Sequence, residues 1–186
     1  MCIRDRFIGD GSQLTNLSVS SPFSLNDTSG NGIQSPTNTA SGDYSMATGY
    51  ENIASGQYST AMGQATKANG PISTAMGFNT TASGQSSTAM GGGTTASGVG
   101  STAMGGGTSA SGFASTAMGN ETTASGEFST ATGLYSIASG SWSTAMGYLT
   151  IASGPSSTAM GWNNQANGGA STCLLYTSDA ADEVVS

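Results

Sequence analysis

The sequence predicts an all-β fold, a parallel β-roll built from short identical coils. Serine recurs every 14 residues from position 45 to position 171, and nine complete units run from Ser45 to Ala170. Unit positions 1, 3, 5, 10 and 12 are always Ser, Ala, Gly, Ala and Gly. A fixed period of this kind indicates a repeat architecture. Two glycines per unit, together with Ser and Thr, oppose any helix.

The composition alone would indicate disorder, and the repeat argues against it. Leu, Ile, Val and Phe number 23 of 186 residues, whereas disorder becomes common in charged chains below roughly 20% of these residues. A disordered chain has no need of glycine at fixed 14-residue intervals, so the regular spacing favours an ordered solenoid of about nine to ten coils.

Each unit predicts two strands and two turns. The consensus is S-T-A-M-G-x-x-T-x-A-S-G-x-x, and we expect strands of about five residues over S-T-A-M-G and T-x-A-S-G. Glycine closes each strand because it permits a positive φ or a close approach of neighbouring coils. The variable x-x pairs after each glycine are expected to form the turns.

The side-chain alternation of a strand separates the unit into two faces. We expect Met at position 4 and Thr at position 2 to point into the coil. Ser, Ala and Gly would then face a closely approaching neighbour. A core of seven Met side chains is thin for so long a chain, so the sequence predicts an oligomer.

The charge balance excludes several classes of partner. Three basic residues against ten acidic ones give a net charge of −7, which argues against binding to nucleic acid or to anionic membranes. Histidine is absent, which removes the commonest general base and metal ligand.

The repeat S-T-A-M-G followed by T-x-A-S-G resembles the YadA-like head domain of trimeric autotransporter adhesins, over residues 39–172. The resemblance implies a left-handed parallel β-roll, a homotrimer and a non-catalytic role in attachment to host matrix or cells, with no cofactor or metal. It also implies an extracellular location on the bacterial surface, with the full-length protein anchored in the outer membrane. The sequence departs from the family pattern at position 2, where Thr replaces Val, and at position 8, where Thr, Ser or Asn replaces Ala.

The remaining segments are expected to differ from the repeats. Residues 7–38 form a boundary segment in which Gly9-Asp10-Gly11-Ser12 predicts a turn. Residues 1–6 can be encoded by ATG TGT ATA AGA GAC AG, whose reverse complement encodes Cys173-Leu174-Leu175-Tyr176-Thr177 and the start of Ser178. This string resembles a sequencing adapter, so residues 1–6 and 173–186 are predicted to be translated adapter.

Candidate sites are few, and no catalytic, cofactor or metal residue is predicted. Gly91-Gly92-Gly93 and Gly105-Gly106-Gly107 lack the Lys-Ser/Thr of a phosphate loop, and no aspartate recurs in a fixed column as calcium rolls require. A disulfide between Cys2 and Cys173 is not expected. Glu51, Glu121 and Glu127 read as solvated turn residues, and Asn79-Thr80-Thr81 and Asn120-Glu121-Thr122 are glycosylation-type sequons. Surface aromatic residues occupy the variable columns and could contact a ligand or pack between subunits: Tyr50, Tyr58, Phe78, Phe113, Phe128, Tyr135, Trp142, Tyr148 and Trp162.

Other functions fit less well. A bacteriophage tail fibre or another structural repeat is the main alternative to an adhesin. An ice-binding solenoid would use its Thr columns at positions 2 and 8, but these columns are predicted to lie singly on separate strands. An acyltransferase β-helix needs a hexapeptide repeat and a histidine, and both are missing.

Overall fold

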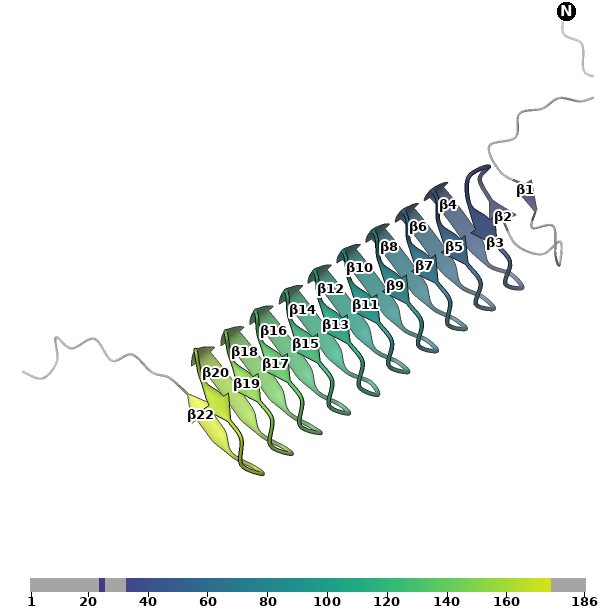
Figure 1. Ribbon diagram of the computed structural model, residues 1–186. Coiled ribbons are helices and arrows are strands. Elements are labelled where there is room, and N and C mark those ends of the chain that lie inside the picture. Colours follow the sequence, from purple (N-terminus) through teal and green to yellow (C-terminus); the bar gives the residue numbers. More distant parts are fainter. Residues whose placement is uncertain (1–23, 26–32, 175–186) are drawn as a thin grey trace, which may run out of the picture.

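The computed structural model describes residues 24–25 and 33–174, which form a straight rod of stacked coils (Figure 1). Each coil contributes one long and one short strand. The long strands are β4 Met46–Tyr50, β6 Thr60–Gln64, β8 Thr74–Phe78, β10 Thr88–Gly92, β12 Thr102–Gly106, β14 Thr116–Asn120, β16 Thr130–Leu134, β18 Thr144–Tyr148 and β20 Thr158–Trp162. The short strands are β3 Thr39–Ala40, β5 Ile53–Ala54, β7 Lys67–Ala68, β9 Thr81–Ala82, β11 Thr95–Ala96, β13 Ser109–Ala110, β15 Thr123–Ala124, β17 Ile137–Ala138, β19 Ile151–Ala152 and β21 Gln165–Ala166.

The long strands form one sheet, here the long-strand sheet, and the short strands form a second, the short-strand sheet. β2 (Ile33–Gln34) and β22 (Thr172–Leu174) extend the long-strand sheet at its two ends, and β1 (Ser24–Leu25) pairs with β2 as its one antiparallel strand. All other pairs in the described residues are parallel, and each complete coil pairs with the next at a shift of 14 residues, as in Thr88 opposite Thr102. The predicted parallel solenoid of about ten coils is therefore confirmed, although its second strand is shorter than expected.

The interior of the rod consists of small side chains. Nineteen alanines, at positions 3 and 10 of the coils, form two ladders that are 0–2% exposed. Ser at position 1 and Thr, Asn or Ser at position 8 are buried beside them from Asn38 to Asn164. Each coil thus adds one layer of buried alanine and small polar side chains to the core.

The expected orientation of the strands is wrong. Ala at position 3 is fully buried in every coil, whereas Thr at position 2 and Met at position 4 point outward and are largely half-buried. The physical reason is width: two sheets joined by two-residue turns enclose room for Ala and Ser but not for the longer Met side chain. The long-strand sheet therefore turns its larger side chains away from the core.

The glycines at positions 5 and 12 are required by the stacking of the coils. At Gly91 and Gly84 a Cβ would overlap the carbonyl oxygen of the equivalent glycine one coil further on, Gly105 and Gly98. The position-5 glycines also have φ between 109° and 129°, where L side chains are strained. Close approach and backbone conformation together explain why no other residue occupies these columns.

The backbone hydrogen bonds that join neighbouring coils continue through the turns. The second residue of each x-x pair, as in Trp142 (φ 56°) and Glu121 (φ 52°), has a left-handed conformation. Its N–H still donates to the preceding coil, from Glu121 to the Gly106 oxygen at 2.8 Å and from Trp142 to the Glu127 oxygen at 2.8 Å. The turns are therefore as regular as the sheets.

Candidate interaction surfaces

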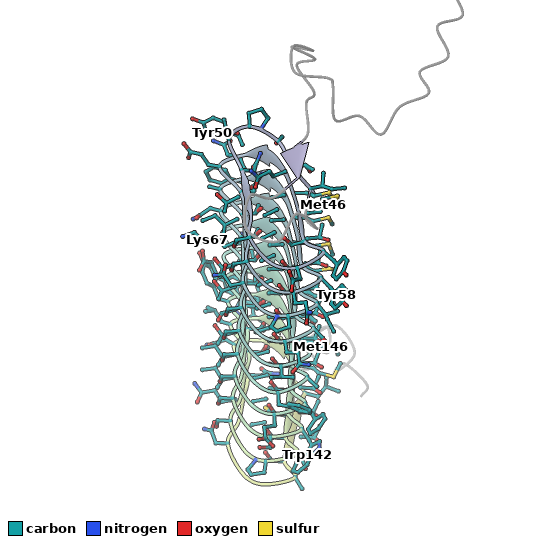
Figure 2. The ribbon with its side chains drawn as sticks, turned by 90° about the vertical axis from the view of Figure 1, so that its right-hand side faces the viewer. Met46, Tyr50, Tyr58, Lys67, Trp142 and Met146 are labelled. Carbon is teal, nitrogen blue, oxygen red and sulfur yellow. The ribbon has the colours of Figure 1, made fainter. Side chains whose placement is uncertain are left out.

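The outer face of the long-strand sheet carries a continuous row of methionine and threonine, here the Met face. Figure 2 places Met46 and Met146 on the same side of the rod. Seven coils carry Thr at position 2 and Met at position 4, β4 carries the two in reverse order as Met46 and Thr48, and β16 has Thr at both positions. The methionines are Met62, Met76, Met90, Met104, Met118, Met146 and Met160.

The Met face is uncharged, and its residues stay partly exposed in the part of the chain that the structure describes. Its methionines are half-buried except Met118, which is 36% exposed. Parallel strands hold equivalent side chains about 4.8 Å apart along the rod, so the sulfur atoms form a regular apolar row. Fully burying one Met contributes about 1.5–3 kcal/mol. Because these side chains are only half-buried in one chain, covering the Met face would contribute part of that free energy for each Met.

The buried hydroxyl column at position 8 takes part in no surface. Thr66 Oγ1 donates to Asn52 Oδ1 at 2.7 Å, and Thr150 Oγ1 donates to Ser136 Oγ at 2.9 Å. The Oγ1 atoms of Thr80, Thr94, Thr108 and Thr122 are buried with no hydrogen-bond partner. Since this Thr column lies inside the rod, it cannot supply the exposed Thr row that an ice-binding solenoid needs.

The outer face of the short-strand sheet is mostly hydroxylic. Position 9 holds half-buried or exposed residues, most of them polar, such as Thr81 and Lys67, together with three isoleucines, Ile53, Ile137 and Ile151. Position 11 holds exposed Ser or Asn. Two side-chain bonds join neighbouring coils in this column, from Ser55 Oγ to Asn69 Oδ1 at 3.0 Å and from Ser153 Oγ to Asn167 Oδ1 at 2.7 Å. This polar face contrasts with the Met face on the opposite side of the rod.

The aromatic residues lie along the two edges where the sheets meet. The first edge consists of the last residue of each long strand and the residue after it (positions 6 and 7). The second edge consists of positions 13 and 14, which come before the strand. Figure 2 shows Tyr50 of the first edge on one side, and Tyr58 and Trp142 of the second edge on the other. Ring contacts run along each edge: Tyr44–Tyr58 (5.2 Å), Phe113–Phe128 (5.2 Å) and Phe128–Trp142 (6.1 Å) on the second, and Tyr135–Tyr148 (6.3 Å) and Tyr148–Trp162 (4.3 Å) on the first.

The polar candidates from the sequence are spread over the edges and form no common site. Glu51, Glu121 and Glu127 are exposed turn residues. Glu51 raises the pKa of its neighbour Tyr50, first by a side-chain hydrogen bond and then by its charge. In the described residues no three His, Cys, Asp or Glu side chains gather into a group that could hold a metal ion.

The glycine triplets and the sequon asparagines also lie on the first edge. In each triplet the first glycine belongs to the close-packed column, and the other two form the turn. Asn79 and Asn120 are exposed at this edge. Thr81, which completes the sequon of Asn79, is half-buried, and Thr122, which completes the sequon of Asn120, is buried. The edge therefore presents glycine backbone or side chains that do not converge on one point.

The ends of the chain fall mostly outside the described residues. The G-D-G-S turn, Cys2 and residues 175–186 are among those on which the structure gives no description. Cys173 is half-buried with a free thiol and stands opposite Ala159, in the alanine column. Among the residues that are described there is no helix, and so none long and apolar enough to cross a membrane.

The sequence found the edges but missed the Met face. The variable columns identify the exposed aromatic residues, because a turn tolerates many side chains. Strand alternation does not say which face is inside, so it could not place Met on the outside. The one sign in the sequence is that Ala is invariant at position 3 while Met gives way to Thr at position 4, because an exposed column tolerates such exchange better than a core.

A rod of identical coils with a filled interior, one apolar face and one polar face defines a repeat protein whose contacts are made by its outside. The family described as the YadA head domain repeat matches residues 36–52, 54–80, 82–108, 110–136, 138–164 and 152–172. The chain belongs to this family of head repeats. No curated protein matches the sequence.

Proposed function

We propose that the chain is a non-catalytic segment of a bacterial surface adhesin, which attaches to host matrix or cells as a homotrimer. Membership in the YadA head family supports an adhesin-type role and exposure at the cell surface. The Met face is the observation that carries the proposal, because a row of half-buried methionines leaves apolar area that other copies can cover.

In this assembly three rods pack with their Met faces toward a common axis. The small-residue interior offers no room for a ligand, so attachment uses the outside of the trimer: the hydroxylic short-strand face and the exposed parts of the edges. Many weak contacts along a long rod, presented three times, add up to firm attachment through avidity.

The proposal is tested by adhesion of coated beads. Beads carrying the full chain are expected to bind decellularised matrix or cultured cells saturably and above the level of bare beads. The matched control is the Met76→Glu/Met104→Glu variant, which places two carboxylates per chain on the Met face and is expected to remain monomeric. At a low coating density, at which the units on one bead are too far apart to bind together, its binding should fall at least tenfold because each unit presents one rod instead of three.

Two results would each contradict one part of the proposal, the adhesin role or its dependence on the trimer. Beads that bind neither matrix nor cells, although the protein on them is trimeric, would favour a purely structural fibre segment such as a phage tail fibre. Equal binding by the wild type and a monomeric Met variant would show that adhesion does not depend on the trimer.

A further inference from the structure

The two edges of the rod are matched in size from coil to coil. Where position 14 before a long strand is large, position 6 after the same strand is generally large, and where one is small the other is generally small. Large pairs flank β4 (Tyr44 and Tyr50), β8 (Ile72 and Phe78), β16 (Phe128 and Leu134) and β18 (Trp142 and Tyr148). Small pairs belong to β10 (Ser86 and Gly92) and β12 (Gly100 and Gly106), and β14 combines a small residue with a polar one (Ala114 and Asn120). In β6 and β20 a large residue is paired with a polar or smaller one.

No contact within one chain accounts for this match. Trp142 precedes β18 and Tyr148 ends it, and the five residues of that strand alone span roughly 13 Å. The ring contacts described above all join residues of the same edge in nearby coils. Trp142 is 61% exposed and Phe128 46% exposed, so in a single chain the second edge stays open to solvent.

A cyclic assembly brings the two edges together at equal height. When copies surround an axis parallel to the rod, symmetry places the same coil of every copy at the same level. With the Met faces turned to that axis, the first edge of each copy lies beside the second edge of its neighbour. A large residue then meets a large residue at β4, β8, β16 and β18, and glycine or serine meets glycine at β10 and β12.

We propose that neighbouring copies are held together at these four strands by contacts between their large edge residues, here called the clasp, with Trp142 of one chain packed against Tyr148 and Leu149 of the next. This inference rests on the proposed trimer and assigns its lateral contacts. No charged residue occurs between Glu127 and Leu174, so nothing in this part of the rod opposes an apolar contact. Tyr and Trp are the residues that most often dominate such interfaces.

Chemical cross-linking tests the contact directly. The Trp142→Cys/Tyr148→Cys variant, in a Cys2→Ser/Cys173→Ser background, is treated with bismaleimidoethane, whose reach is too short to join the two positions within one chain. The clasp predicts that most chains run as covalent trimers on a denaturing gel. The control Trp142→Cys/Tyr50→Cys joins coils seven steps apart, about 34 Å along the rod, and should stay uncross-linked.

Fluorescence quenching tests the same contact with the aromatic residues in place. Trp162→Phe leaves Trp142 as the reporter. Trp142→Phe leaves Trp162, whose strand is preceded on the second edge by Pro155 and Ser156, with no aromatic residue. In a single chain the two indoles are about equally exposed, at 61% and 63%. In the assembly, acrylamide should quench Trp142 several-fold less than Trp162.

The outcomes separate the clasp from the trimer. A trimeric mass with no cross-link and equal quenching of the two tryptophans would overturn the clasp and leave the trimer standing. Equal cross-linking of the matched and mismatched pairs would also overturn it. A monomeric mass would overturn both proposals.

Discussion

At the scale of single residues, the glycines show how one residue type serves three purposes in adjacent positions. Gly91 belongs to a column in which a Cβ would overlap the next coil. Gly92 has no atom within 4 Å of where its Cβ would lie. Gly93 has equally free space, the nearest atom being at 3.9 Å, but its φ is +66°. A phosphate-loop reading of this triplet would miss these differences.

An alanine scan of the triplet should therefore give three different results. Gly91→Ala is expected to destabilise the fold by more than about 3 kcal/mol, because a backbone oxygen cannot move aside without shifting a coil. Gly93→Ala should cost about 1 kcal/mol through its left-handed φ, and Gly92→Ala less than about 0.5 kcal/mol. Urea unfolding measures the series, and equal losses at all three positions would contradict this assignment.

The buried hydroxyls allow a second comparison between matched residues. Thr108 Oγ1 is buried without a partner, whereas Thr150 Oγ1 donates to Ser136. Thr108→Val keeps the shape and removes an unsatisfied polar group, so it should raise the free energy of unfolding by about 1 kcal/mol. Thr150→Val should lower it by about 1 kcal/mol because a hydrogen bond is lost. A Thr108→Val variant less stable than the wild type would show that the hydroxyl has a partner after all.

At the scale of the strand and the coil, the sequence predicted how the coils stack but not which face of each strand points into the core. The fixed Ser, Ala and Gly columns predict the parallel stack and its 14-residue register, and Thr88 stands opposite Thr102 as they require. The direction of the strands did not follow, because alternation separates two faces without saying which is inside. The width of the coil decides it, and that width depends on the turns and on the glycine contacts between coils. The Met face was hidden for the same reason.

Coils should be removable as whole units. Deleting residues 87–100 removes one coil and leaves every column aligned, so the shortened chain should keep its β-sheet circular dichroism and a single cooperative unfolding transition. Deleting residues 87–99 leaves one coil a residue short and breaks an alanine or a glycine column there. This variant should unfold at least 5 °C lower than the 14-residue deletion. Identical melting temperatures would argue against a strict register.

At the scale of the whole molecule, a rod with a thin core depends on association. The Met face gains full burial only when copies pack together, so the melting temperature should rise with chain concentration. Met76→Glu/Met104→Glu should abolish that rise and lower the melting temperature. The control is Ser83→Glu/Ser111→Glu, which adds the same charges to the exposed hydroxyl column on the opposite face and should retain the concentration dependence.

The molar mass of the full chain in solution, measured by light scattering over a range of concentrations, tests the central claim most directly. The account predicts three times the 18.2 kDa chain mass for the wild type and for Ser83→Glu/Ser111→Glu, and a single-chain mass for Met76→Glu/Met104→Glu. A wild-type mass of one chain at every concentration, with a melting temperature that does not change, would contradict it.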